Sequence, residues 1–249
     1  MMARIRPALA LIALGLSSLA VAQGSDEAAF IIDAMIENLR AESVRATVVI
    51  TVTDGDKVTE RVLEILSVGD DRSLITVVTP PRDAGQAFLN VGQNLFIYNP
   101  RLRRTLRLPP SGRSDNFLDS DLSFNDLAGD DYRQDYTATV VERDNYSVIL
   151  ELTPDPQAPT PYGKLLYSAD ATTFAPTLLV FFDQRGQAVR EIRFSNVIEA
   201  NGRHIPTRLE VHDLLSEGSS TVAVWQDYDF DAEISESCFN QQALERGCR

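Results

Sequence analysis

The chain first shows a helical pattern, between Asp26 and Ser43. Apolar residues recur there at spacings of three and four positions, which places them on one face of an α-helix. Asp26 and Glu27 stand in the first turn, where the helix dipole favours negative charge. The predicted face consists of Phe30, Ile31, Ala34, Met35, Asn38 and Leu39. A helix with one apolar face must pack against another layer of the protein.

From residue 46 onwards apolar and polar residues alternate, which is typical of β-strands. In Ala46–Thr53, for example, valine and isoleucine alternate with threonine, and Asp54-Gly55 then marks a hairpin turn. The predicted strands cover residues 46–53, 57–68, 73–79, 86–91, 94–99, 103–108, 136–143, 147–153, 163–168, 176–184, 188–199, 204–213 and 220–229. We interpret them as roughly ten or eleven strands of a single large antiparallel sheet.

This order of elements predicts a mainly β fold that also contains an α-helix. A single curled antiparallel sheet would be covered by the N-terminal helix. Two interpretations of its interior carry equal weight on composition alone. One is an ordinary core filled by the sheet and the helix. The other is a residual apolar cavity, because one helix rarely fills the concavity of a wide curled sheet.

The N-terminus carries the pattern of a secretory signal peptide. Arg4 and Arg6 precede an uncharged run from Ala8 to Val21, and the run ends in the A-x-A sequence at Ala22. We expect cleavage after Ala22, with residues 1–22 as the signal peptide and residues 23–249 as a single domain. The mature chain would begin at Gln23, which offers no cysteine for a lipid anchor. We therefore expect a soluble protein of the periplasm.

The charge of the chain is strongly acidic, at −13. Loss of Arg4 and Arg6 with the signal peptide would change it to −15. A surface of this charge repels the phosphates of nucleic acids, so we expect no nucleic-acid partner.

Basic residues nevertheless gather in one short segment. They are Arg101, Arg103, Arg104, Arg107 and Arg113. One interpretation is a charged edge strand that resists aggregation. The other, given equal weight, is a basic mouth that contacts an anionic headgroup or an acidic partner, with the first four arginines as the contact residues.

The remaining polar residues give little support to catalysis or metal binding. His204 and His212 have neither a G-x-S-x-G serine nor metal-ligand spacing around them. The acidic residues Asp119, Asp121, Asp126, Asp130 and Asp131 lack the spacing of a calcium loop, and we interpret them as solvated loop carboxylates. We therefore expect no enzyme, no metal and no cofactor.

Cys238 and Cys248 are the only cysteines, and export would place them where disulfides persist. A disulfide between them is the favoured interpretation. Two reduced thiols are the alternative, and a metal site is less favoured still.

Three motifs in order resemble the LolA-like outer-membrane lipoprotein-sorting family. They are Pro80–Leu89 (PPRDAGQAFL), Leu95–Pro100 (LFIYNP) and Asp119–Leu127 (DSDLSFNDL). Tyr167–Asp213 resembles the paired strands of that family, and Phe239 and Leu244 fit its closing helix. The sequence departs from the family at Asp119, where glycine is common, and at Phe124, where tyrosine is common.

The resemblance implies a half-barrel of about 11 strands with a helical lid and an apolar cavity for acyl chains. The expected function is that of a carrier for a lipoprotein or lipid, with an inner-membrane exporter and an outer-membrane acceptor as possible partners. The residues expected to bind lipid are Phe30, Ile31, Met35, Phe88, Phe96, Tyr98, Phe182, Phe194 and Trp225. The competing hypothesis is a non-enzymatic envelope adaptor or accessory domain of a membrane exporter, which predicts a filled core and an exposed patch.

Overall fold

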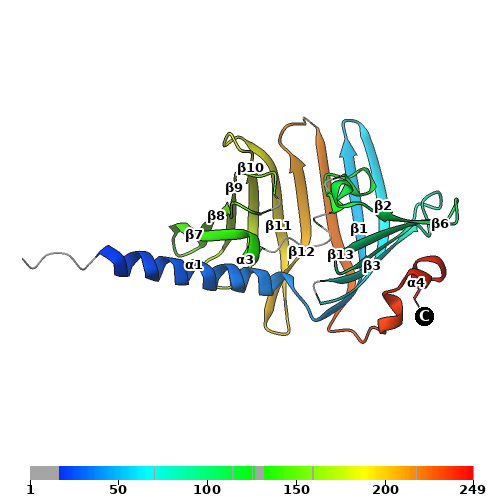
Figure 1. Cartoon of the computed structure of the whole chain (residues 1–249), viewed down its shortest axis with the longest axis horizontal. Helices are drawn as coiled ribbons and strands as arrows, with labels where there is room; N and C mark the ends of the chain where they lie inside the picture. Colours follow the sequence, from blue (N-terminus) through cyan, green and yellow to red (C-terminus); the bar gives the residue numbers. More distant parts are fainter. Residues whose placement is uncertain are drawn as a thin grey trace, which may run out of the picture.

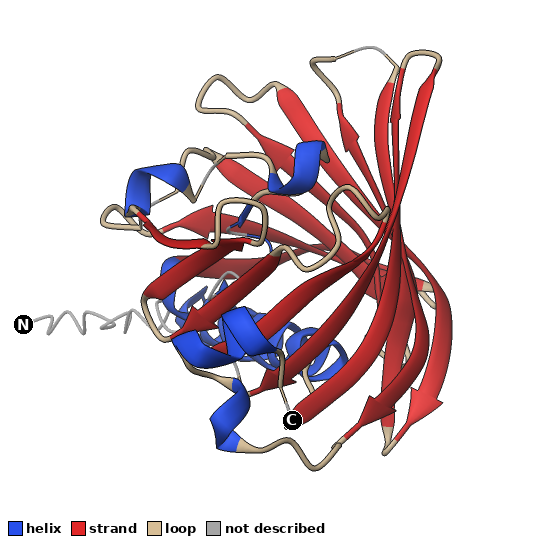
Figure 2. Ribbon diagram, turned by 90° about the vertical axis from the view of Figure 1, so that its right-hand side faces the viewer, coloured by secondary structure: helices blue, strands red, loops and turns tan. Residues whose placement is uncertain are grey.

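The computed structural model describes residues 17–69, 71–113, 115–124, 126, 132–158, 160–216 and 218–248, with side chains from residue 26 onwards. The described part holds one antiparallel sheet of thirteen strands in the order β6-β5-β4-β3-β2-β1-β13-β12-β11-β10-β9-β8-β7. The sheet is strongly curved and does not close into a barrel (Figure 2). The mainly β fold with an N-terminal helix is confirmed, whereas the expected number of strands was too low.

Each strand follows a segment that the alternating pattern predicted. The strands are β1 (Ser43–Asp54), β2 (Lys57–Val68), β3 (Arg72–Thr79), β4 (Ala87–Val91), β5 (Asn94–Asn99), β6 (Arg104–Leu108), β7 (Tyr136–Arg143), β8 (Ser147–Pro154), β9 (Lys164–Asp170), β10 (Pro176–Phe182), β11 (Ala188–Ala200), β12 (Arg203–Asp213) and β13 (Ser219–Phe230). In β1, Val48, Ile50 and Val52 are buried, while Thr47, Thr51 and Thr53 on the other face are partly exposed. A strand with one face on the core alternates in this way.

Helix α1 (Ser17–Leu39) lies along the half of the sheet that contains β7 to β12 (Figure 1). It begins inside the predicted signal peptide and ends before Ser43, because Ser43 pairs with Val68 as the first residue of β1. Its buried apolar residues are Ala28, Ile31, Ile32, Met35 and Ile36. The predicted apolar face was therefore rotated: Phe30 is 63% exposed and Leu39 is also exposed.

The sheet has two faces with different covers. We call the face under α1 the concave face and the other the outer face. The short helix α4 (Gln241–Arg246) lies against β4 and β5 at the far end of the sheet from α1 (Figure 1). Its Leu244 packs with Phe239 and Cys238 over Leu74 and Leu89 on the outer face.

The remaining short helices are η1 (Pro110–Gly112), η2 (Phe117–Asp119), α3 (Tyr132–Asp135) and η3 (Glu236–Cys238). Cys238 and Cys248 form the expected disulfide, which ties the end of the chain beside α4. In the described residues no helix has both the length and the apolarity that a membrane-spanning segment needs.

Candidate functional site: the concave face of the sheet

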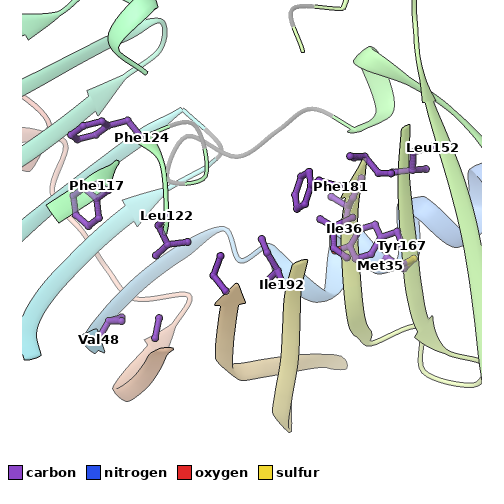
Figure 3. Close-up of a cluster of buried hydrophobic side chains, with 14 of the residues drawn as sticks. Met35, Ile36, Val48, Phe117, Leu122, Phe124, Leu152, Tyr167, Phe181 and Ile192 are labelled. Carbon is purple, nitrogen blue, oxygen red and sulfur yellow. The ribbon is translucent and has the colours of Figure 1, made fainter. Parts of the chain in front are cut away.

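One apolar cluster runs across the concave face through both halves of the sheet. It includes Ile75 and Phe88 from β3 and β4 at one end, and Leu150 and Tyr167 from β8 and β9 at the other. Val48 of β1 and Ile192 of β11, both labelled in Figure 3, come from strands that lie between β3 and β9 in the sheet. The continuity of this lining makes the concave face the candidate site.

The half of this face formed by β1 to β5 is covered by a segment that we call the crossing loop, residues 115–124 and 126. Its Phe117 and Phe124 meet Phe88 of β4, with ring centroids 4.8 Å and 5.8 Å from that of Phe88. The two loop rings lie 5.6 Å apart in an edge-to-face arrangement. Such aromatic pairs stabilise contacts beyond their buried area. Figure 3 shows both rings, with Leu122, on this side of the cluster.

Two carboxylates hold the crossing loop across the sheet. Asp121 accepts hydrogen bonds of 2.7 Å from the hydroxyls of Ser219 and Thr221 at the start of β13. Asp126 forms a bidentate pair with Arg190 of β11, at 2.9 Å and 2.8 Å. The interpretation of these two residues as solvated was wrong, because sequence spacing alone does not reveal partners about 64 to 100 positions away. Asp130 and Asp131 lie outside the described residues.

The Asp126–Arg190 pair is largely withdrawn from water, with side chains 15% and 13% exposed. Burial of the guanidinium lowers the pKa of Arg190, but the charge and hydrogen bonds of Asp126, together with the interaction with Tyr162, raise the pKa above its ordinary value. The guanidinium also lies 5.1 Å above the ring of Phe181. The crossing loop is thus fixed to the opposite half of the sheet by a charged bond within an apolar surrounding.

The other half of the concave face is covered by α1. Ile31 and Met35 are fully buried in the concave cluster, and Figure 3 shows Met35 close to Tyr167 and Phe181. The hydroxyl of Tyr167 has no hydrogen-bond partner among the described residues. Burial raises the pKa of Tyr167 because the phenolate would lose its hydration. The surroundings of Tyr167 in this half are therefore apolar.

Polar contacts fasten the C-terminal end of α1. The side chain of Asn38 donates to the carbonyl of Thr173 at 2.8 Å and accepts from the backbone N–H of His204 at 2.6 Å. Arg203 donates to the carbonyl of Arg40. Closer to the N-terminus of α1, Asp33 forms an ion pair with Arg133 of α3 on the exposed side of the helix.

A polar cavity of about 270 Å³ opens beside the Phe88 cluster. It is lined by Arg61, Asp83, Gln86, Phe88, Ile97, Asn116, Leu118, Asp119 and Phe124. Asp119 has a φ of +57°, so it adopts the left-handed conformation that glycine takes most readily. Its carboxylate reaches Arg61 of β2 at 3.3 Å. Asp119 thus combines a backbone conformation typical of glycine with a charge at the cavity.

A family model described as an uncharacterized protein, of the DUF1329-like family, matches residues 69–246. The chain belongs to this family. A solved DUF1329 family protein from Desulfovibrio piger has 22% identity and a TM-score of 0.81, over 89% of this chain and 99% of that chain. The comparison with curated proteins gave no match.

Two further solved structures connect this DUF1329-like protein with the LolA-like fold. An outer membrane lipoprotein-sorting protein domain from Vibrio parahaemolyticus has 19% identity and a TM-score of 0.79, over 89% of this chain and 100% of that chain. A LolA superfamily protein from Nitrosomonas europaea has 23% identity and a TM-score of 0.72, over 86% of this chain and 98% of that chain. The LolA-like fold expected from the motifs is confirmed.

The residues expected to bind lipid in this DUF1329-like protein are divided between the two faces. Ile31, Met35, Phe88, Phe194 and Trp225 lie in or against the concave cluster. Phe96 and Tyr98 pack instead with the C-terminal segment on the outer face. Phe182 is half-buried under the ammonium of Lys164, and its neighbour Phe181 occupies the concave face. A shift of one residue along a strand reverses its faces, which explains these exchanges.

The expected headgroup contacts lie at a sheet edge. Arg101, Arg103, Arg104 and Arg107 are exposed, and the last two belong to β6, the terminal strand beyond β5. Arg113 lies elsewhere, where it lines a small void with Asn90 and Phe124. No group of three or more metal-ligating side chains occurs among the described residues.

Sequence reasoning missed the residues that organise the site. Arg61, Arg190, Phe117 and Tyr167 were not named as site residues, although Phe124 and the two loop aspartates lay inside a recognised motif. A single arginine within an apolar strand was the available signal for Arg61, because a charge at an inward position needs a partner.

Proposed function

We propose that this protein is a non-enzymatic periplasmic carrier that shields the acyl chains of a lipoprotein or lipid and delivers its cargo towards the outer membrane. The observation that carries the proposal is the continuous apolar lining on the concave face of an open sheet. The likeness of the fold to an outer membrane lipoprotein-sorting protein domain and to a LolA superfamily protein supports it.

Carriage requires that the two covers of the concave face can move. Both α1 and the crossing loop place their own apolar side chains where acyl chains would lie, so cargo would replace side-chain contacts by lipid contacts. Each buried methylene contributes about 0.8 kcal/mol. One or two acyl chains therefore supply enough free energy to displace a cover, and return of the cover would release the cargo to an acceptor.

Native mass spectrometry with lipid extraction tests the proposal on protein purified from a periplasm without detergent. We expect a co-purifying amphiphile in the wild-type protein and its loss in Phe88→Ser. The matched control is Phe239→Ser, because Phe239 is 7% exposed but lies on the outer face. Thermal unfolding shows whether both variants are folded. A ligand-free wild-type protein that also refuses added phospholipid would overturn the proposal.

A filled interior and an exposed apolar patch favour the second candidate, an envelope adaptor or an accessory domain of an exporter. The concave cluster consists of closely packed side chains, and the adjoining cavity has many polar walls. The β1–β2 and β12–β13 hairpins lie side by side, because the N–H of Gly55 donates to the carbonyl of Gly218. Exposed apolar residues lie at both hairpins: Val58 at the first, and Leu214 and Leu215 at the second. The adaptor gains support if lipid is refused and substitution of Leu215 by serine abolishes capture of an envelope protein.

A further inference from the structure

Arg61 is a buried cation on the concave face of β2. Its cross-strand partner Ile50 and its neighbour Leu63 both belong to the apolar cluster, and Arg61 itself is 4% exposed. Two of its guanidinium nitrogens, Nε and Nη1, have no hydrogen-bond partner among the described residues. A buried donor without a partner is costly, and it usually marks a missing acceptor.

Arg61 has two acidic neighbours, and neither makes a tight charged hydrogen bond with it. Asp119 lies 3.3 Å from Nη2, but its side chain is 93% exposed and therefore well hydrated. Asp83 lies 3.5 Å from Nε and also pairs with Arg82 at 3.3 Å. Tight charged hydrogen bonds are shorter, at about 2.7–2.9 Å. Arg61 thus keeps capacity for a further oxygen ligand.

The cavity at Arg61 offers that ligand room and further donors. Its volume of about 270 Å³ lies just below the range of about 300–1,000 Å³ that holds drug-sized molecules, so it suits a headgroup-sized one. Gln86 and Asn116 line it with Arg61, and both residues carry a side-chain amide that can donate hydrogen bonds. Donors from three elements can surround a tetrahedral oxyanion, whereas a planar carboxylate presents only two oxygens. The unpaired atoms of Arg61 are donors, which favours an anion over a cation.

The same cavity touches the apolar cluster. Phe88 and Phe124 line the cavity and also belong to the concave cluster. A molecule with its polar end at Arg61 would therefore place its next atoms against these rings. We propose that the Arg61 cavity is a phosphate-binding subsite that recognises the phosphate in the headgroup of the carried amphiphile. This inference rests on the proposed carrier function, because it assigns a chemical class to the cargo.

Calorimetric titration of the purified full chain with a matched pair of soluble lipids tests the subsite. Dihexanoylphosphatidylglycerol carries a phosphate, and dihexanoylglycerol has the same acyl chains without it. We expect the wild-type protein to bind the phospholipid at least about tenfold more tightly. Arg61→Gln should remove this preference and leave the affinity for dihexanoylglycerol unchanged. The matched control is Arg193→Gln, because Arg193 is 61% exposed and projects from the outer face beside Glu191.

A second variant and a second probe cover the case in which Arg61→Gln does not fold. Gln86→Leu should lower the phospholipid preference about threefold, because it removes one donor and leaves Arg61 in place. Inorganic phosphate, followed by ³¹P line broadening, should bind weakly to the wild-type protein and less to each variant.

The outcomes separate the subsite from carriage. Equal affinity for both lipids in the wild-type protein would overturn the phosphate subsite while carriage stands. Binding of neither lipid, with phosphate broadening that depends on Gln86 and Arg61, would overturn the assignment to a lipid headgroup and indicate a site for free phosphate. A phospholipid preference unaffected by Gln86→Leu and Arg61→Gln would place recognition elsewhere, for example at the β6 arginines.

Discussion

The two halves of the concave face are covered in different ways. Over β7 to β12 the helix α1 buries apolar side chains such as Met35. The ion pair between its Asp33 and Arg133 lies on its exposed side. Over β1 to β5 the crossing loop is irregular, and charged groups fix its position: the largely buried pair of Asp126 with Arg190 of β11, and the exposed Asp119 beside the buried Arg61. Apolar contacts are non-directional, whereas hydrogen-bonded charges specify one arrangement. The helix half thus offers adaptable apolar area, and the loop half offers selective polar contacts.

The largest expected effect concerns the charge that fixes the loop half. Arg190→Met leaves Asp126 buried without its cation, so we expect the free energy of unfolding to fall by about 3–5 kcal/mol. The matched change in the helix half is Arg133→Met, whose pair with Asp33 is 36% and 55% exposed, and it should cost less than about 1 kcal/mol. Urea unfolding measures both. Equal losses would show that the two covers are held in the same way.

The helix half should respond to lost volume instead of lost charge. We expect Met35→Ala to reduce the free energy of unfolding by about 3 kcal/mol, because Met35 is fully buried and the change leaves a cavity. Phe30→Ala is the control on the same helix, and it should cost about 1 kcal/mol since most of that ring is exposed and it meets Phe174 edge-on. A larger loss at Phe30 would contradict the observed orientation of α1.

Alternation of residue types, apolar runs and turn residues together were sufficient to locate every strand of the described sheet. The limits of Lys57–Val68, Asn94–Asn99 and Tyr136–Arg143 were predicted without error, because turn residues and β-branched residues mark them clearly. The face of β10 was not predictable, since its run of Leu178 to Phe182 is apolar on both sides. In α1, likewise, apolar residues occur on more than one face. The sequence did not show that Ile32 and Ile36 would be buried instead of Phe30 and Leu39.

The candidate site was predictable only where it depends on local pattern. Phe88 and Met35 were found because their motif and helical spacing indicate burial. Asp121, Asp126 and Arg190 were not assigned, because their hydrogen bonds join segments that become neighbours only when the sheet curves. Arg61 belongs to the same class, since its significance depends on an unpaired guanidinium and a cavity that three distant segments form.

The stability that Asp170 contributes to the turn beside α1 should depend on pH. Asp170 accepts hydrogen bonds from the backbone N–H of Thr173 and Thr172, and these outweigh the opposing effect of burial and lower its pKa from 3.8. A lowered pKa in the folded state stabilises the protein above pH 3.8, and this contribution is lost as the pH falls through the folded pKa.

Asp170→Ala should therefore cost about 1–2 kcal/mol at pH 7, and the difference from wild type should shrink below pH 3.8. Unfolding by urea at pH 7, 5 and 3 gives the comparison. A difference that stays constant across these pH values would mean that the carboxylate does not act through its charge.

The smallest expected effect tests whether the helix half is dry. Tyr167 buries a hydroxyl that has no partner among the described residues, directly under α1. Removing an unsatisfied buried polar group recovers its desolvation cost, so we expect Tyr167→Phe to raise the free energy of unfolding by about 1 kcal/mol. Thermal unfolding of lipid-free protein measures the change. A loss of stability would mean that the hydroxyl has a polar partner within the concave face, and the contrast between an apolar helix half and a polar loop half would then fail at Tyr167.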